Sequence, residues 1–279
     1  MPTVKANGID LHYEQHGSGE PLLLIMGWGG NAATWRPQIP GLSERFHVTV
    51  FDNRGVGRTD APHEPYSTSQ MADDALHLMD TLGLDRAHVF GISLGGMIAQ
   101  ELTLAHPERV GALILGCTTP GGAKAAGAGE LHGNIADFRE TFKNGKSPDL
   151  EWLSAFLKRL WTDEALLRSE SALQDFVLSL IRFPPTPHGL RNQAGAVREH
   201  DALDRLHRIE APTLVITGDE DGLIDPENSA ILADLIPQAE LCVFPRLRHA
   251  FHLERPDLVN PVIIDFIRRS GPSLDSGVL

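Results

Sequence analysis

Short, almost continuously apolar runs alternate along this chain with longer segments of helical spacing. The runs read PLLLIMG, HVTVFD, HVFGIS, GALILGC, TLVITGD and AELCVFP. A strand that is apolar at nearly every position must be covered on both faces, as the strands of parallel sheets are. Since parallel strands need a crossover between them, usually a helix, the alternation predicts an α/β domain with helices on both faces of a mostly parallel sheet.

Several helix ends can be located in the sequence. Apolar residues recur with a period of about 3.6 over 69–82, and Gly83 follows, where the left-handed backbone of a helix C-cap costs little. The spacing also predicts helices over 94–105 and 226–235, each of which ends shortly before a proline. A last helix is expected to begin near Pro256 and to close the domain.

The middle of the chain has a different pattern. A Gly/Ala-rich stretch, GGAKAAGAGELHG, precedes two segments of helical spacing, LEWLSAFLKRLW and ALLRSESALQDFVLSLIRF, with no strand pattern between them. We therefore predict a helical cap inserted over 121–198. The core domain is then formed by 1–120 and 199–279.

The composition is that of a folded protein, with 42% hydrophobic and 22% charged residues. A formal net charge of −13 repels phosphate backbones and anionic membrane surfaces, so nucleic acid is not an expected partner. The first residues lack the basic and apolar segments of a signal peptide, and no apolar run approaches the roughly 20 residues of a membrane span. We expect a soluble cytoplasmic protein without a membrane partner, and the composition leaves a homo-oligomer open.

The chain has two cysteines, Cys117 and Cys242, each within a β-like apolar run. Their placement in separate strands provides neither a disulfide framework nor zinc-ligand spacing. We therefore expect two buried free thiols that behave as small hydrophobic side chains.

A Gly-x-Ser-x-Gly motif, Gly91 to Gly95, follows one of the apolar runs and precedes helical spacing. A serine in such a sharp strand-to-helix turn adopts strained backbone angles, and its neighbours must lack side chains so that strand and helix can approach. The turn places the hydroxyl at a helix N-terminus, where developing negative charge is favoured. Ser93 is therefore the candidate nucleophile, and a chance Gly/Ser loop is the alternative.

Because this motif lies in this context, the chain resembles the α/β-hydrolase family over nearly its whole length. The resemblance implies a mostly parallel, eight-stranded sheet flanked by helices, with a helical cap inserted. It also implies acyl transfer by a serine, histidine and acid that follow one another in the order nucleophile, acid, histidine. Such chemistry needs neither a cofactor nor a metal.

Four carboxylates follow the late strand TLVITGD, where the family places its acid: Asp219, Glu220, Asp221 and Asp225. The family's Gly-Asp-x-Asp turn carries over to Asp221 as the triad acid. Asp219 suits hydrogen bonds to backbone amides of the turn, and Asp225 precedes a proline where a helix should begin. Glu220 is expected to face solvent.

A serine hydroxyl is a weak nucleophile at neutral pH, so a base must take its proton. After Asp221 only His249 and His252 remain in the chain. In the family, the histidine is followed five residues on by a glutamate and then by a proline, and His249 with Glu254 fits that register. His252 would shift the register by three, and we expect it to start a helix or line the pocket. No further ligands of suitable spacing support a metal bound by the two histidines.

The oxyanion of a tetrahedral intermediate needs hydrogen-bond donors. The resemblance assigns this role to the backbone N–H groups of Leu94, directly after the nucleophile, and of Trp28, after the strand PLLLIMG. The family usually begins this second loop with a His-Gly pair, whereas this chain has Met26-Gly27. We expect a functional oxyanion hole with different packing behind it.

Arg54 and Asp60, in the Gly-rich stretch FDNRGVGRTD, are candidates for substrate anchors. Arginine and aspartate in such turns more commonly tie loops together. We favour that structural role for both.

The favoured function is hydrolysis of carboxylic esters of small to medium, mainly apolar substrates through an acyl-enzyme intermediate. The rate should rise with pH near the ordinary histidine pKa of about 6.5. Lactone or enol-lactone hydrolysis and cofactor-free, haloperoxidase-like perhydrolysis use the same triad and are alternatives. A ligand receptor that keeps the fold without turnover is a further alternative, since fold alone does not settle function.

Overall fold

The computed structural model describes residues 2–129, 133, 150–168 and 171–270. Within this part of the chain, the centre is an eight-stranded sheet in the order β1-β2-β4-β3-β5-β6-β7-β8. The strands are β1 (Thr3–Ala6), β2 (Ile9–His16), β3 (Glu20–Ile25), β4 (Phe46–Phe51), β5 (Ala87–Ile92), β6 (Val110–Gly116), β7 (Thr213–Gly218) and β8 (Glu240–Phe244). β2 pairs antiparallel with both of its neighbours, and all other neighbours are parallel, which confirms the predicted sheet.

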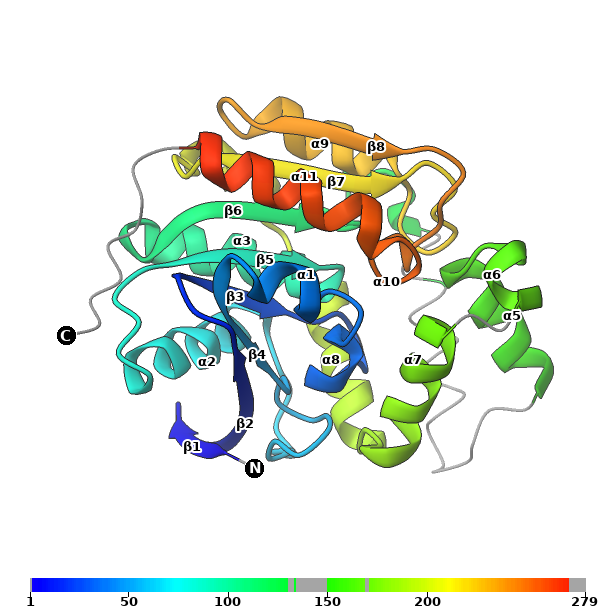
Figure 1. Cartoon of the computed structure of the whole chain (residues 1–279), viewed down its shortest axis with the longest axis horizontal. Helices are drawn as coiled ribbons and strands as arrows, with labels where there is room; N and C mark the ends of the chain where they lie inside the picture. Colours follow the sequence, from blue (N-terminus) through cyan, green and yellow to red (C-terminus); the bar gives the residue numbers. More distant parts are fainter. Residues whose placement is uncertain (1, 130–132, 134–149, 169–170, 271–279) are drawn as a thin grey trace.

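Helices cover both faces of the sheet (Figure 1). One face carries α2 (Thr68–Thr81), α3 (Leu94–Ala105) and α9 (Glu227–Leu235), and the other carries α1 (Ile39–Ser43) and α11 (Pro256–Arg269). In β3, Leu23 and Ile25 enter the core beneath α2 and α3, whereas Leu22 and Leu24 enter the opposite core. Both sets of side chains are buried, which explains why this strand is apolar at successive positions.

The helical insertion follows β6. Its described helices are α5 (Leu150–Leu160), α6 (Asp163–Arg168), α7 (Ser171–Arg182) and α8 (Pro187–Glu199). The second helical segment expected from the sequence is therefore two helices, α6 and α7, and part of the Gly/Ala-rich stretch lies outside the described residues. Gly121 and Asp201 form an isolated antiparallel bridge, so the chain leaves and re-enters the core at adjacent points.

Two expectations about single residues need correction. Cys117 is buried, but Cys242 is only half-buried because it lies on β8, at the edge of the sheet. Arg54 does tie loops together, but its partner is the buried Asp74 of α2 rather than Asp60. Asp60 accepts a hydrogen bond from the backbone N–H of Asp10 instead.

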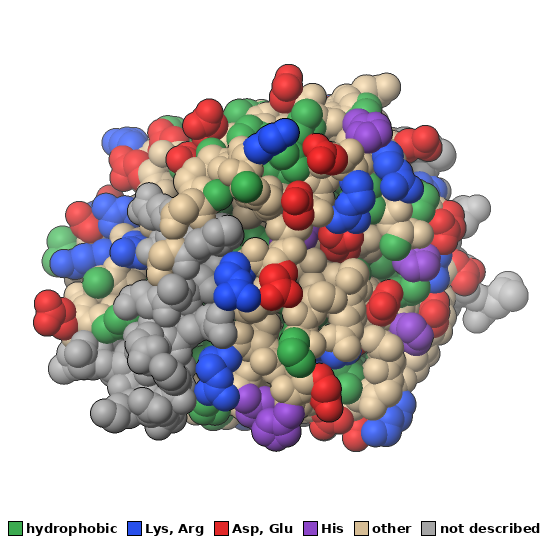
Figure 2. Space-filling model, turned by 180° about the vertical axis from the view of Figure 1, so that it is seen from behind, with side chains coloured by type: hydrophobic (Ala, Val, Ile, Leu, Met, Phe, Trp, Pro, Cys, Tyr) green, Lys and Arg blue, Asp and Glu red, His purple; other side chains and the backbone are tan. Residues whose placement is uncertain are grey.

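Charged side chains of both signs are interspersed over the described part of the face seen in Figure 2, without a continuous basic surface. No helix among the described residues has the combination of length and hydrophobicity that crossing a bilayer requires.

Substitution of Gly95 in α3 tests how closely this helix approaches the sheet. A Cβ atom at Gly95 would lie 2.0 Å from the backbone oxygen of Ile25, so Gly95→Ala must push α3 away from β3. We expect a loss of about 1–3 kcal/mol in the free energy of unfolding, measured by urea denaturation, as overpacked cores show.

Gly195 in α8 is the matched control. No described atom lies within 4 Å of a Cβ built there, and its backbone is helical. Gly195→Ala should leave the stability unchanged or raise it by up to about 1 kcal/mol through helix propensity. Equal losses in the two variants would contradict the close approach of α3 to β3.

Candidate active site

Ser93 occupies the turn between β5 and α3. Its φ of 57° and ψ of −119° lie outside the regions that side chains favour. The turn is possible because Gly91 lacks a side chain: a Cβ there would lie 2.2 Å from the backbone oxygen of Gly95. The carbonyl of Ser93 accepts hydrogen bonds from Gly96 N at 2.9 Å and from Thr118 Oγ1 at 2.7 Å. The serine is therefore held rigidly at the N-terminus of α3.

The loop after β3 lies beside Ser93. A Cβ built on Gly27 would be 3.6 Å from Ser93 Oγ. Leu94 is the first residue of α3, where backbone N–H groups have no acceptor within the helix. The structure thus brings the Gly27-Trp28 loop and the start of α3 together around the serine hydroxyl.

Side chains that the sequence did not single out hold this loop. Asn53 Nδ2 donates to the carbonyl of Met26 at 2.8 Å. Gln193, fully buried in α8, accepts from Gly29 N at 3.0 Å through Oε1 and donates to the carbonyl of Arg54 at 2.8 Å through Nε2. These bonds stiffen the loop in a chain that has methionine where the family usually has histidine.

The indole of Trp28 provides a further tie to the insertion. Its Nε1 donates to the carbonyl of Leu190 in α8 at 2.9 Å. Gln193 and Leu190 lie more than 160 residues from the loop that they hold. No local pattern could have revealed them, because the contact depends on where α8 docks.

Asp221 and His249 form a buried pair, with His249 Nδ1 2.7 Å from Asp221 Oδ2. The other carboxylate oxygen of Asp221 accepts from Leu223 N at 2.8 Å and Ile224 N at 3.0 Å. The carboxylate oxygen accepts the ring N–H, so in the neutral form of His249 the proton is on Nδ1 and Nε2 is the acceptor on the far side of the ring. This is the tautomer that a general base requires.

The pKa of His249 reflects two opposing influences. Burial disfavours the charged imidazolium and acts to lower the pKa. The negative charge of Asp221 and the hydrogen bond to it outweigh burial, with a smaller contribution from Cys117. The pKa of His249 is therefore well above the ordinary value of 6.5.

The other three carboxylates in the Asp221 loop have different environments. Asp219 Oδ1 accepts from Arg246 N at 2.5 Å, as a turn aspartate does. Asp225 Oδ1 accepts from Glu227 N at 3.0 Å at the beginning of α9. Glu220 is exposed. Of the four, Asp221 is the one that contacts His249.

His252 lies in α10 (Phe251–Glu254) and is buried, with 3% of its surface exposed. Its ring packs 5.5 Å from that of Trp35, and neither ring nitrogen has a hydrogen-bond partner among the described residues. Burial, followed by the nearby His249, lowers the pKa of His252 to about 3, so its ring stays neutral. It lies in the first turn of a short helix, near the helix entry expected for it, and its ring packs in the core.

Cys117 adjoins both His249 and Ser93. Its Sγ lies 3.9 Å from His249 Nε2 and donates to the His249 carbonyl at 3.4 Å, and the backbone N–H of Ser93 donates to the carbonyl of Gly116, the residue before Cys117, at 2.8 Å. Cys117, Asp221 and His249 have metal-binding atoms within 4.8 Å of one another. Burial raises the pKa of the thiol, and Asp221 already bonds Nδ1 and two amides, so these groups suit proton transfer better than metal binding.

The chain is similar over nearly its whole length to known hydrolases. The chain is 32% identical over 266 residues to "Putative carbamate hydrolase RutD" of Azorhizobium caulinodans, over 95% of this chain and 98% of that protein. The solved enol-lactonase of Burkholderia xenovorans has a TM-score of 0.85 at 26% identity and covers 96% of this chain and 100% of its own. A thermophilic esterase of Thermogutta terrifontis has a TM-score of 0.86 at 26% identity, over 98% of this chain and 100% of its own.

A family model described as alpha/beta hydrolase fold matches residues 20–256. This span includes the turn at Ser93, the Gly27-Trp28 loop and the loops that carry Asp221 and His249. The chain therefore belongs to the α/β-hydrolase family, and it is a hydrolase.

Proposed function

We propose that this hydrolase cleaves carboxylic esters of small to medium, mainly apolar substrates through an acyl-enzyme intermediate on Ser93. The observation that carries the proposal is the buried 2.7 Å contact between His249 and Asp221, which makes Nε2 the nitrogen that accepts a proton when the ring is neutral. Cys117 contacts that nitrogen, and the preceding residue, Gly116, accepts the backbone N–H of Ser93, so one short segment adjoins both the base and the nucleophile.

In the proposed mechanism, Ser93 Oγ attacks the ester carbonyl while His249 Nε2 takes the hydroxyl proton. The imidazolium then returns that proton to the departing alkoxide, which leaves as the alcohol. Water then attacks the acyl group while His249 takes its proton, and the imidazolium returns that proton to Ser93 Oγ as the bond to the acyl group breaks and the acid product leaves. Asp221 holds the tautomer, and the N–H groups of Trp28 and Leu94 stabilise the oxyanion.

Esters are the favoured class because an alkoxide leaving group demands less of the general acid than an amine does. The likeness to a solved esterase supports this choice. Lactones are the second candidate, since the likeness to an enol-lactonase favours the same bond in a ring. We also propose that the insertion over 121–198 caps the substrate site, with the described helices α5 to α8 as its walls.

Removing the proposed nucleophile is the first test. Ser93→Ala should lower the turnover of p-nitrophenyl butyrate by a factor of about 10³ or more, because no other hydroxyl takes its place. A fluorophosphonate probe should add mass at Ser93 of the wild type and not to the variant. Labelling of the wild type without multiple turnovers on esters or lactones would favour a ligand receptor.

The two histidines of the loop should behave differently. His249→Ala should lower kcat nearly as much as Ser93→Ala, since both remove one step of the same proton transfer. His252→Leu should keep most of the activity, because the ring nitrogens of His252 make no hydrogen bond among the described residues and its ring packs in the core. Equal losses in two folded variants would refute the assignment of His249.

The pH profile tests the Asp221–His249 pair. The base acts only when neutral, so kcat/KM should rise as pH increases through the pKa of His249, in a range above 6.5. Asp221→Asn removes the charge that raises this pKa, so the rising limb should move to lower pH while kcat falls by about 10³–10⁴-fold. If kcat/KM of Asp221→Asn rises over the same pH range as that of the wild type, a group other than Asp221 must raise the pKa of His249.

A further inference from the structure

We propose that the junction of α5 and α6, residues 158–163, positions His249 and does so through Arg248 and Glu254. The inference rests on the proposed role of His249 as the base. Residues 245–250 form a loop between β8 and α10, so no strand or helix fixes the histidine directly. The loop needs other contacts to hold its imidazole in register with Asp221.

Both sequence neighbours of His249 bond to the end of α5. The backbone N–H of Ala250 donates to the carbonyl of Leu160 at 2.7 Å. Arg248 Nη1 donates to the carbonyls of Lys158 at 2.8 Å and Trp161 at 2.9 Å. The last carbonyls of a helix have no partner within it, so these donors cap α5.

The same guanidinium also reaches α6. Arg248 Nη1 lies 3.0 Å from Asp163 Oδ1, at the first residue of that helix. The arginine side chain is 21% exposed, so it is largely enclosed between the two helices and its own loop. One side chain thus joins the end of α5, the start of α6 and the residue before His249.

Glu254 holds the other end of the loop. It accepts hydrogen bonds from the backbone N–H of Thr162 at 3.2 Å and from the Thr162 hydroxyl. That hydroxyl in turn accepts from Ala165 N at 3.2 Å, within the first turn of α6. The glutamate five residues after His249, by which the sequence register identified the base, therefore has a physical role as the second anchor of the histidine loop.

Apolar packing joins the same segments. Trp161 is fully buried in a small core with Ala250 of the histidine loop and Leu253 of α10, and Leu223 of the Asp221 loop packs against this core. A Cβ at Gly222 would lie 3.3 Å from the Cα of Arg159, so the Asp221 loop also contacts the end of α5. Both loops of the proposed triad thus rest on one short segment of the insertion.

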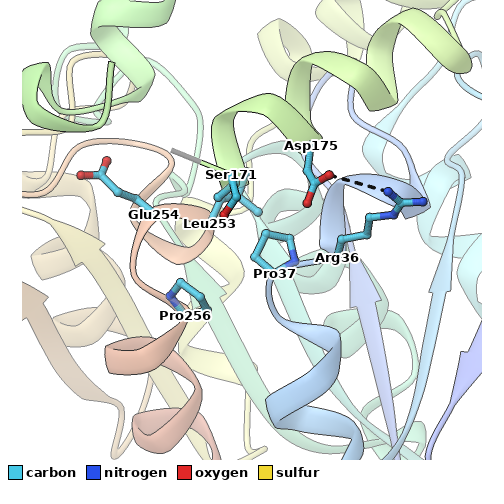
Figure 3. A pocket seen from close by; sticks show the side chains of 8 residues that line it. Arg36, Pro37, Ser171, Asp175, Leu253, Glu254 and Pro256 are labelled. Atoms are coloured by element: carbon cyan, nitrogen blue, oxygen red, sulfur yellow. Dashed lines mark ion pairs between the residues drawn. The ribbon is translucent and has the colours of Figure 1, made fainter. Parts of the chain in front are cut away.

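A second tie between insertion and core is weaker. Arg36 and Asp175 of α7 lie 3.7 Å apart, with side chains 57% and 39% exposed, beside a cavity of about 350 Å³ (Figure 3). An exposed pair of this kind contributes little to stability. Glu254 lines the same cavity, so the Glu254–Thr162 contact and the Arg36–Asp175 pair lie near each other. The hydrogen bonds concentrated at the histidine loop are the ones suited to positioning.

The experiment compares three single variants with the wild type. Arg248→Met removes the hydrogen bonds and keeps the aliphatic length, Thr162→Val removes one hydroxyl from the insertion, and Arg36→Met is the control that breaks the exposed tie. We expect kcat for p-nitrophenyl acetate and butyrate to fall about tenfold or more in the first variant and less in the second, since a misplacement of about 1 Å can cost about 10²-fold. KM should change little, and Arg36→Met should match the wild type.

Two further variants separate positioning from a general structural role. Arg248→Lys should recover part of kcat, because an ammonium can still bond one carbonyl. In a His249→Ala background, Arg248→Met should cause no further loss, since a residue that acts through His249 has nothing left to act on. Thermal melting establishes that each variant is folded, and Thr162→Val carries the test if Arg248→Met does not fold.

The proposal is overturned if kcat is unchanged in both Arg248→Met and Thr162→Val. It is also overturned if only KM rises, more for butyrate than for acetate, which would indicate that the junction merely covers the substrate. The proposal is likewise overturned if Arg248→Met lowers kcat further in the His249→Ala background, because Arg248 would then not act through His249. Failure of the proposed function would be visible separately, as a wild type without turnover or a His249→Ala variant as active as the wild type.

Discussion

The close approach of α3 to β3 and β5 is the constraint on which the site depends. Gly91 and Gly95 allow helix and strands to come within backbone contact, and only at that distance does the chain turn sharply enough to give Ser93 its strained conformation. The strain is sustained because the two apolar cores on either side of the sheet hold the elements in place. The stability of the fold and the placement of the Ser93 hydroxyl at the N-terminus of α3 thus have the same origin.

Around that turn, separate parts of one insertion hold the surrounding loops. α8 bonds the Gly27-Trp28 loop through Leu190 and Gln193, and the α5–α6 junction bonds the histidine loop. The insertion is therefore more than a cover for the substrate in the proposed mechanism. It supplies the rigidity that loops between strands and helices lack, and loop residues need such support to keep catalytic distances.

Much of this arrangement could be predicted from the sequence, because local rules govern it. Continuous apolar runs specify buried parallel strands, glycines at fixed offsets specify the turn at Ser93, and chain order limits the base to two histidines. The contacts of Gln193 and Arg248 could not be predicted, since they join segments about 90 to 165 residues apart. The half-exposure of Cys242 depends on which strand forms the sheet edge, which apolar patterning does not specify.

The hydrogen bonds between the histidine loop and the α5–α6 junction also affect the order in which parts of the chain can fold during synthesis. A protein is synthesised from its N-terminus, so the serine turn and the inserted helices emerge before residues 248–254. Until those residues arrive, the last carbonyls of α5 lack their arginine and Trp161 lacks part of its apolar cover. Docking of the histidine loop therefore caps the end of α5 and, in the mechanism proposed above, completes the catalytic site in one step. An unfinished chain would hold an exposed serine without the base that activates it.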